Sequence, residues 1–288
     1  MFVFHHRDID GYASAAVVRQ AFPEERINYV PCDYSFPLDS HLPEIQRNEK
    51  VVIVDYSFKD NTVVELENII CHVGFSNVTW IDHHVSSVRL VAERPDLGLL
   101  PGIRNDKCSG AVLTYMHYHG ETREEACPLF LRFISDYDTW TKRMPESDDF
   151  NRGLFMEEMD PTSPLWDELY DMKRVELVIR NGNTVNRYLD MYYRHRRKKW
   201  MFVTEFEGYR TAAINQKESS EEFGEERVNF PLSVIFQTNG KKWFYTVYSS
   251  DPAIDCSEIA ARYGGGGHKG AAGFTTEELL DCFKHVNV

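Results

Sequence analysis

The first segment of the chain that could do chemistry is HHRDIDG at residues 5–11, which holds two histidines and two aspartates within six positions. In an extended or loop segment, residues two apart project to the same side, so Asp8 and Asp10 should lie close together with His6 behind them. Two carboxylates that close repel each other unless a cation or a proton lies between them, and a divalent metal ion meets this need. The structural alternative is that Asp10 caps a helix over residues 12–21.

Three later segments carry the same residue types. They are VVIVD with Asp55, IDHHV with Asp82, His83 and His84, and SDYDTW with Asp136 and Asp138. Each alone has an ordinary explanation, as a turn residue, a polar pair at a loop mouth or a solvated helix end. Together they complete a set of two imidazoles and four carboxylates: His6, Asp8, Asp10, Asp55, His83 and Asp136. This set suits two ions such as Mn²⁺ or Mg²⁺, which at roughly 3.5–4 Å apart activate a water and neutralise a phosphoryl transition state.

The elements that must position these residues are short apolar strands. Strands are expected at residues 2–5, 51–55 and 78–82, a weaker one at 27–30, and helices at 12–21 and 61–70. Alternation of strands and helices predicts a parallel α/β sheet. Ligands of such sheets bind beyond the carboxyl ends of the strands, which is where His6, Asp55 and Asp82 fall.

The second half of the chain changes character. Helices are expected within residues 109–142 and 165–200, strands at 210–215, 232–237 and 243–248, and a helix at 256–263. The Pro-rich and acidic stretch at 145–164 is expected either to run over the surface or to begin a connector. Asn239-Gly240 predicts a hairpin turn between the last two strands. We therefore expect an α/β domain over residues 1–145, a helical connector over 146–200 and a smaller α/β domain over 201–288.

Composition limits the partners. The formal net charge of −13 gives little electrostatic help in binding long nucleic acids, so a long duplex is not an expected partner. The six cysteines form no CxxC pair, which argues against a zinc cage and a disulfide framework. No apolar run approaches the length of a membrane span, and no signal peptide is visible, so we expect no membrane association and a cytoplasmic setting. The sequence leaves a homodimer open.

The run GGGGH at residues 264–268 suggests contact with an anion, because consecutive glycines let backbone N–H groups approach a phosphate. No GK[ST] follows, so hydrolysis of a nucleoside triphosphate by a Walker loop is not indicated. The structural alternative is a glycine-rich turn between a helix and a strand.

On these motifs the chain resembles the DHH phosphoesterase family, which is named for the triplet found here as Asp82-His83-His84. The segment GGGGHKGAAGF resembles the signature of the family's DHHA1 domain. The compact HxDxDG form and SDYDTW look most like the nanoRNase-B type of oligoribonuclease. The resemblance covers essentially the whole chain and implies a DHH catalytic domain followed by a DHHA1 substrate-binding domain.

The resemblance also implies roles. One Mn²⁺ would be bound by His6 and Asp8, a second by Asp10, His83 and Asp136, and both by Asp55, with Mg²⁺ or Co²⁺ as alternative ions. His84 would contact the scissile phosphate or the leaving group, and Asp82 would support it. Two alternatives stay open: His5 in place of His6, and Asp138 in place of Asp136. The substrate clamp would comprise Arg262, Gly265, Gly266, Gly267 and His268.

The implied activity is a Mn²⁺-dependent exonuclease that degrades very short RNA, from dinucleotides to about pentamers, to 5′-mononucleotides. Alternatives are a 3′-phosphoadenosine 5′-phosphate phosphatase and a cyclic dinucleotide phosphodiesterase. A nucleotide-binding module without catalysis is disfavoured, because every expected ligand type is present.

Overall fold

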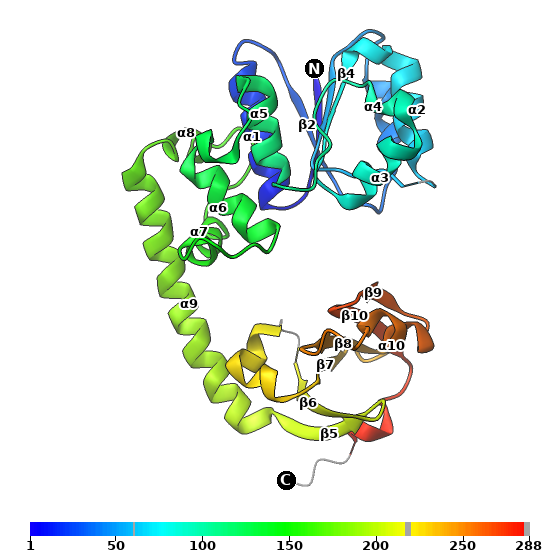
Figure 1. Ribbon diagram of the computed structural model, residues 1–288, viewed down its shortest axis with the longest axis vertical. Helices are drawn as coiled ribbons and strands as arrows, with labels where there is room; N and C mark the ends of the chain where they lie inside the picture. The colour runs from blue at the N-terminus through cyan, green and yellow to red at the C-terminus, as the bar shows by residue number, and fades with distance from the viewer. Residues whose placement is uncertain (60, 217–219, 285–288) are drawn as a thin grey trace. The chain divides into compact units, whose positions relative to one another are not determined.

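The computed structural model describes residues 1–59, 61–216 and 220–284. The chain forms two compact units, Met1–Asn186 and Arg187–Val288, and the boundary falls inside the long helix α9, Met172–Trp200 (Figure 1). The expected division at residues 145 and 200, into a catalytic domain, a connector and a substrate-binding domain, stays a proposal. Among the described residues, no helix combines the length and the apolar character that crossing a membrane requires.

The first unit contains the parallel sheet that the sequence predicts. Its strands are β1 (Phe2–His6), β2 (Asn28–Cys32), β3 (Val51–Val54) and β4 (Val78–Ile81), in the order β2-β1-β3-β4. All four residues of β3 are buried, as expected for a β-branched strand covered on both faces. His5 of β1 pairs with Val54 of β3, and Val54 pairs with Ile81 of β4. The carboxyl ends of these three strands therefore lie side by side at one edge of the sheet.

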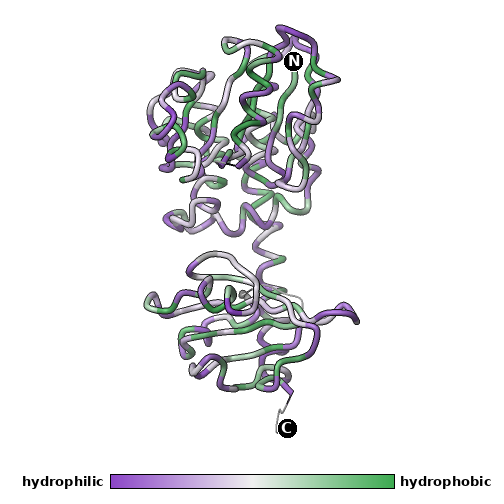
Figure 2. The backbone as a smooth tube through the Cα atoms, turned by 90° about the vertical axis from the view of Figure 1, so that its right-hand side faces the viewer, coloured by the Kyte–Doolittle hydropathy of each residue, from purple (hydrophilic) through white to green (hydrophobic). Residues whose placement is uncertain are grey.

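Helices cover both faces of this sheet (Figure 1). One face carries α1 (Ile9–Ala21), α5 (Gly110–His119), α6 (Leu129–Asp138), α7 (Ser147–Leu154) and α8 (Leu165–Glu168), and the other carries α2 (Val63–Val73), α3 (Val85–Glu93) and α4 (Pro95–Gly98). Alternate strand residues supply the two cores: Val3 packs with α1 and α5, whereas Phe2 and Phe4 pack with α2. Hydrophobic residues follow the inner strands, and hydrophilic residues follow most outer loops (Figure 2).

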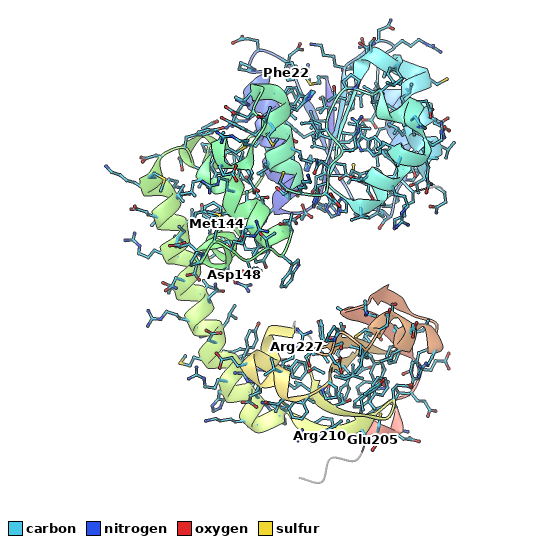
Figure 3. The ribbon with its side chains drawn as sticks, viewed as in Figure 1. Phe22, Met144, Asp148, Glu205, Arg210 and Arg227 are labelled. Atoms are coloured by element: carbon cyan, nitrogen blue, oxygen red, sulfur yellow. The ribbon has the colours of Figure 1, made fainter. Side chains whose placement is uncertain are left out.

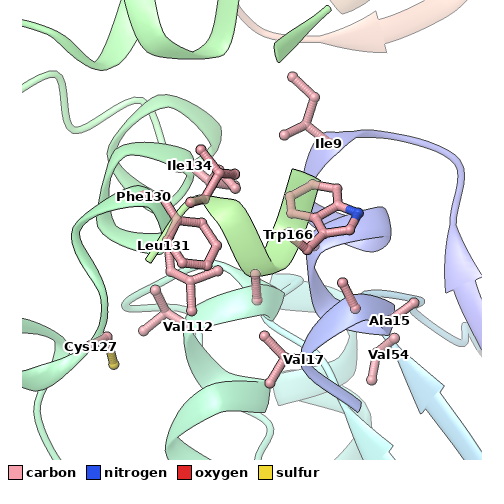
Figure 4. Packing of buried hydrophobic residues seen from close by; sticks show 14 of the residues in the cluster. Ile9, Ala15, Val17, Val54, Val112, Cys127, Phe130, Leu131, Ile134 and Trp166 are labelled. Atoms are coloured by element: carbon pink, nitrogen blue, oxygen red, sulfur yellow. The ribbon is translucent and has the colours of Figure 1, made fainter. Parts of the chain in front are cut away.

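The first core also absorbs the segment that the sequence analysis placed on the surface. Residues 145–164 contain α7, whose Phe150 and Leu154 are fully buried in the cluster that holds Trp166 (Figure 4). The expectation of a surface stretch is wrong there. Asp148 of α7 is exposed and Asp149 accepts hydrogen bonds from Asn183 and Asn186 of α9. The two apolar residues of α7 stand four apart on one helical face, a signal too short to outweigh the acidic composition.

The second unit is built on a six-stranded sheet in the order β5-β6-β7-β8-β10-β9. Its elements are β5 (Phe202–Phe206), β6 (Tyr209–Asn215), β7 (Leu232–Thr238), β8 (Trp243–Ser249), α10 (Cys256–Arg262), β9 (Gly266–His268) and β10 (Ala271–Thr276). Among the strand pairs that the described residues form in this sheet, only β6 and β7 run in parallel. The predicted hairpin at Asn239-Gly240 is confirmed and joins β7 to β8.

Short 3₁₀ segments complete the described chain. They are η1 (Leu38–Glu44), η2 (Phe75–Asn77), η3 (Glu124–Ala126), η4 (Ser220–Asn229) and η5 (Asp281–Phe283). The fold class expected from the sequence, a parallel α/β unit followed by helices and a smaller α/β unit, is confirmed.

Candidate metal centre

Histidine and aspartate side chains gather where β1, β3 and β4 end. His6 is the last residue of β1, while Asp55 and Asp82 come directly after β3 and β4. Asp55 has a positive φ of 53°, a conformation uncommon for a residue other than glycine. Its N–H donates to the Ile81 carbonyl at 2.9 Å, and this bond holds the turn in place.

The first group of potential ligands is His6, Asp8 and Asp55. His6 Nδ1 lies 2.5 Å from Asp8 Oδ2 and 3.9 Å from Asp55 Oδ2. The hydrogen bond to Asp8 raises the pKa of His6. Burial acts to raise the pKa of Asp8, but the bond to His6, the charge of His6 and the Gly11 N–H together outweigh it, so the pKa of Asp8 is lowered.

The start of α1 places Asp8. The helix begins at Ile9, and Asp8 is its N-cap, accepting a hydrogen bond from the Gly11 N–H at 2.9 Å. The capping role considered for Asp10 therefore belongs to Asp8. A Cβ at position 11 would lie 2.2 Å from the His6 carbonyl oxygen, so only glycine lets α1 start this close to the end of β1.

The second group is Asp10, His83 and Asp138. His83 Nε2 lies 3.7 Å from Asp10 Oδ2 and 3.3 Å from Asp138 Oδ2. The same nitrogen is 3.2 Å from Asp55 Oδ1. Asp55 thus contacts both groups, and it also forms a third one with His83 and His84.

Asp10 is anchored from a distant part of the chain. Its carboxylate accepts hydrogen bonds from the Gly110 and Ala111 N–H groups, at 2.7 and 2.9 Å, at the N-terminus of α5. The positive end of a helix favours a negative charge there. A Cβ on Gly110 would lie 2.8 Å from the Cβ of Asp55, so a glycine is needed for α5 to approach.

The electrostatics of the cluster call for a cation. Asp55 is 1% exposed, and neither of its side-chain oxygens accepts a hydrogen bond from the described residues. Burial, followed by the charges of Asp10 and Asp8, raises the pKa of Asp55 well above its ordinary value. Burial and the same two neighbours raise the pKa of Asp138 to about 8. A buried carboxylate without a hydrogen-bond donor, beside further carboxylates and two imidazoles, fits the ligand set of two divalent ions.

The structure does not bring Asp136 into this cluster, and the expected ligand position is filled by Asp138. Asp136 Oδ1 accepts from the Thr141 hydroxyl and the Arg143 N–H, both at 2.7 Å. Its Oδ2 accepts from the Met144 N–H at 3.2 Å and the Ser147 hydroxyl at 2.6 Å. These four bonds outweigh the effect of burial and lower the pKa of Asp136.

Asp136 therefore organises the segment that follows Asp138. Trp140 and Lys142 both have a positive φ, 56° and 49°, which is a strained conformation for such residues. Met144 and Asp148, labelled in Figure 3, lie where this segment turns into α7. The hydrogen bonds to one buried carboxylate hold the strained turn together.

Asp82 and His84 form a separate pair at the rim. Asp82 is fully buried, and its Oδ1 lies 2.8 Å from His84 Nδ1. Burial would lower the pKa of His84, but the bond to Asp82 and the other carboxylates raise it overall. Because Nδ1 is held by Asp82, Nε2 is the ring nitrogen left for a ligand.

His5 and His6 have different environments. His5 is buried, with Nδ1 2.8 Å from the His6 carbonyl oxygen and its ring 4.9 Å from that of Tyr12. Burial lowers the pKa of His5 to about 4. Of the two, the structure brings only His6 into a ligand group.

The expected substrate clamp lies in the second unit. Close packing explains why glycine is needed at positions 265 and 267. A Cβ on Gly265 would lie 2.2 Å from the Gly273 carbonyl oxygen, and a Cβ on Gly267 would lie 2.6 Å from the Ala272 Cα. Gly266 faces open space. Arg262 is exposed and forms an ion pair with Glu207. The side chain of His268 lies outside the described part of the structure.

Tyr34 is a residue at the rim that the sequence analysis did not identify. It lies two residues after β2, and its ring centroid is 5.8 Å from that of His6. Its position at the carboxyl end of a strand of the same sheet was the signal that could have found it.

No protein-family model matches the chain. It is 22% identical to uncharacterized protein R106 of Acanthamoeba polyphaga mimivirus over 99% of this chain and 69% of the relative. It is 24% identical to oligoribonuclease NrnB of Bacillus subtilis over 98% of this chain and 74% of the relative.

Two solved structures share the fold. The pGpG-specific phosphodiesterase PggH of Vibrio cholerae matches with a TM-score of 0.54 and 12% identity, over 96% of this chain and 92% of that one. Exonuclease RecJ bound to manganese matches with a TM-score of 0.51 and 15% identity, over 96% and 86%.

Proposed function

We propose that the chain is a phosphoesterase of the DHH/DHHA1 type that hydrolyses very short oligoribonucleotides, from dinucleotides to about pentamers, to 5′-mononucleotides. The proposed cofactors are two divalent ions, with Mn²⁺ as the main candidate. They would be held by His6, Asp8, Asp10, Asp55, His83 and Asp138.

The observation that carries this proposal is the environment of Asp55. A fully buried carboxylate without a hydrogen-bond donor is costly unless a cation neutralises it. Asp55 lies between two groups that each add a histidine and an aspartate, so it is placed to serve both ions. Bound ions would supply an activated water and charge stabilisation at the phosphoryl oxygens.

Asp82 and His84, next to the proposed ion sites, would assist the hydrolysis. Asp82 holds Nδ1 of His84 and fixes the ring, so that Nε2 can donate a proton or a hydrogen bond to a phosphate or leaving-group oxygen. The raised pKa of His84 favours its protonated, donating form. The formal net charge of −13 gives little electrostatic help in holding a long strand, and the oligoribonuclease NrnB is among the relatives of the chain, which together support a short substrate.

A time course with end-labelled RNA tests the proposal. We would incubate a dinucleotide, a pentamer and a 24-residue RNA with the protein, in Mn²⁺ and in EDTA, beside adenosine 3′,5′-bisphosphate. The proposal expects Mn²⁺-dependent loss of the two short RNAs and sparing of the long one. Release of phosphate from the bisphosphate alone would replace this function with a phosphatase.

Matched variants locate the activity. Asp55→Asn should abolish turnover, because an amide cannot neutralise two cations. Asp190→Asn, on the exposed face of α9, makes the same chemical change at a residue outside the ligand groups and should leave the rate unchanged. Equal activity of the two variants would mean that the cluster is not the catalytic centre.

A further inference from the structure

Beside the candidate metal centre lies an aromatic ring that the proposed chemistry does not use. Tyr34 follows β2, whose last residue Cys32 pairs with His6 at the end of β1. Its ring centroid is 5.8 Å from that of His6, yet the residue is 51% exposed. A large apolar ring that stays exposed next to a cluster of buried carboxylates calls for an explanation.

The ring is held rigidly from behind. It stacks on Tyr56 at 4.9 Å with an interplanar angle of 27°, and Tyr56 is itself buried. Tyr56 packs on Phe58 at 5.4 Å, and Phe58 packs on Trp80 at 5.4 Å, so Tyr34 is the exposed end of an aromatic row that reaches into the core. Its hydroxyl lies 3.4 Å from the Ser57 hydroxyl, which Ser86 also contacts.

This arrangement suits a flat ligand that carries negative charge. Tyr56 covers one side of the Tyr34 ring, and the exposed remainder is available for stacking at little cost in side-chain entropy. The Lys59 ammonium lies 5.7 Å from the ring centroid and adds a positive charge beside a mostly acidic region. A nucleotide combines a planar aromatic base with an adjacent phosphate, and every base has a face that can stack.

We propose that Tyr34 stacks on the nucleobase next to the phosphodiester bond that is cleaved at the metal centre. The proposal rests on the proposed function, since it presumes a nucleotide substrate. Stacking is tolerant of base identity, so Tyr34 would give affinity for dinucleotides of any sequence. The competing explanation is that Tyr34 only supports His6 and the loop after β2.

The test compares Tyr34→Leu, Tyr34→Phe and Phe75→Leu on three substrates. Phe75 is the control: it is an exposed aromatic in η2, ahead of β4 and therefore at the opposite edge of the same sheet. The substrates are the dinucleotide ApA and the two analogues of ApA that lack one base each. Rates are measured at saturating Mn²⁺, and the Mn²⁺ concentration for half-maximal rate is measured separately.

Tyr34→Leu should raise KM for ApA about 30-fold, the middle of the range for one base–aromatic stack, and leave kcat unchanged. For the abasic analogue that lacks the base stacked on Tyr34, the Tyr34→Leu substitution should leave KM unchanged. Tyr34→Phe and Phe75→Leu should behave as the unaltered protein does. The half-maximal Mn²⁺ concentration should not move.

Three results would overturn the inference. An unchanged KM of Tyr34→Leu for ApA would exclude stacking while leaving the proposed function intact. A shifted Mn²⁺ requirement, or an equal loss on both abasic analogues, would assign Tyr34 a supporting role for His6. If the unaltered protein turned over no dinucleotide at all, the proposed function would fail and this inference with it.

Discussion

Asp136 and Asp138 stand two residues apart in different environments, and one pair of substitutions can test the different roles that we expect for them. Asp136 is 5% exposed and accepts four hydrogen bonds from the segment that leads into α7. Asp138 lies 3.3 Å from His83 in the candidate metal centre. We expect Asp136→Ala to cost stability and Asp138→Asn to cost metal affinity.

The magnitude for Asp136 follows from its bonds. A hydrogen bond to a charged group contributes about 1.5–3 kcal/mol, but four bonds to one carboxylate do not add, because water and a relaxed loop replace part of them. A net loss of about 3 kcal/mol is therefore expected. For a unit of this size that is a fall in Tm of about 9 °C. Asp136→Asn keeps one carbonyl acceptor and should lose roughly half as much.

In the absence of metal, loss of the Asp138 carboxylate should not lower the stability of the protein. Its pKa is raised to about 8 by burial and neighbouring carboxylates, so its charged form opposes folding. A raised folded-state pKa gives a stabilising contribution that is present in full below the unfolded-state pKa. That contribution is lost as pH rises through about 8. In EDTA, Asp138→Asn should be at least as stable as the unaltered protein at pH 8, and its stability should fall less between pH 5 and pH 8.

Thermal unfolding in EDTA and Mn²⁺ titration calorimetry together decide the case. Asp138→Asn should weaken Mn²⁺ binding at least ~10-fold, whereas Asp136→Ala, measured well below its Tm, should bind nearly as the unaltered protein does. The reasoning is refuted if Asp136→Ala melts normally and loses Mn²⁺ binding, because Asp136 would then be the ligand. A large loss of stability in Asp138→Asn in EDTA would contradict the assigned electrostatics.

Three more outcomes follow from the same geometry. Mn²⁺ binding at pH 7 should release protons, because Asp138 with its pKa of about 8 is mostly protonated without metal. Binding heats measured by calorimetry in two buffers of different ionisation enthalpy should therefore differ. Equal heats would show that no proton is released. Gly11→Ala should cost about 3 kcal/mol or more of unfolding free energy, since its Cβ would lie 2.2 Å from the His6 carbonyl oxygen; a denaturant midpoint like that of the unaltered protein would contradict the contact. Asp82→Asn should lower kcat by about 10- to 100-fold with little change in Mn²⁺ affinity, because it frees the ring of His84; unchanged kcat would mean that the ring needs no support.

The strand ends could be predicted because each depends on a short local pattern. A run such as VVIV is β-branched and buried on both faces, and the polar residue after it must leave the sheet at its edge. Three such runs in a parallel sheet bring their ends together whatever the details of the connecting helices. The grouping of His6 with Asp8 and of Asp10 with His83 agrees with what the family resemblance implied.

The choice between Asp136 and Asp138 could not be made in the same way. Residues two apart on a helix are about 200° apart around its axis, so the pattern shows that only one of them can face a given site. Which one faces it depends on how α6 is rotated against α1 and α5, and that rotation is set by the packing of Phe130, Leu131 and Ile134. Tyr34 was missed for a similar reason, because its partners come from two separate segments of the chain, at the end of β1 and after β3.

The fold holds the carboxylates of the candidate centre close together, despite their mutual repulsion, before any ion binds. Gly11 and Gly110 allow α1 and α5 to approach until backbone N–H groups hold Asp8 and Asp10. Asp55 receives no such support and is left buried with raised pKa at the point the two groups share. Carboxylates that are already fixed lose little entropy when they bind a cation, and the relief of their repulsion adds to the affinity. We therefore expect a bound cation to stabilise the first unit through Asp55, and we expect Asp55→Asn to remove most of that stabilisation.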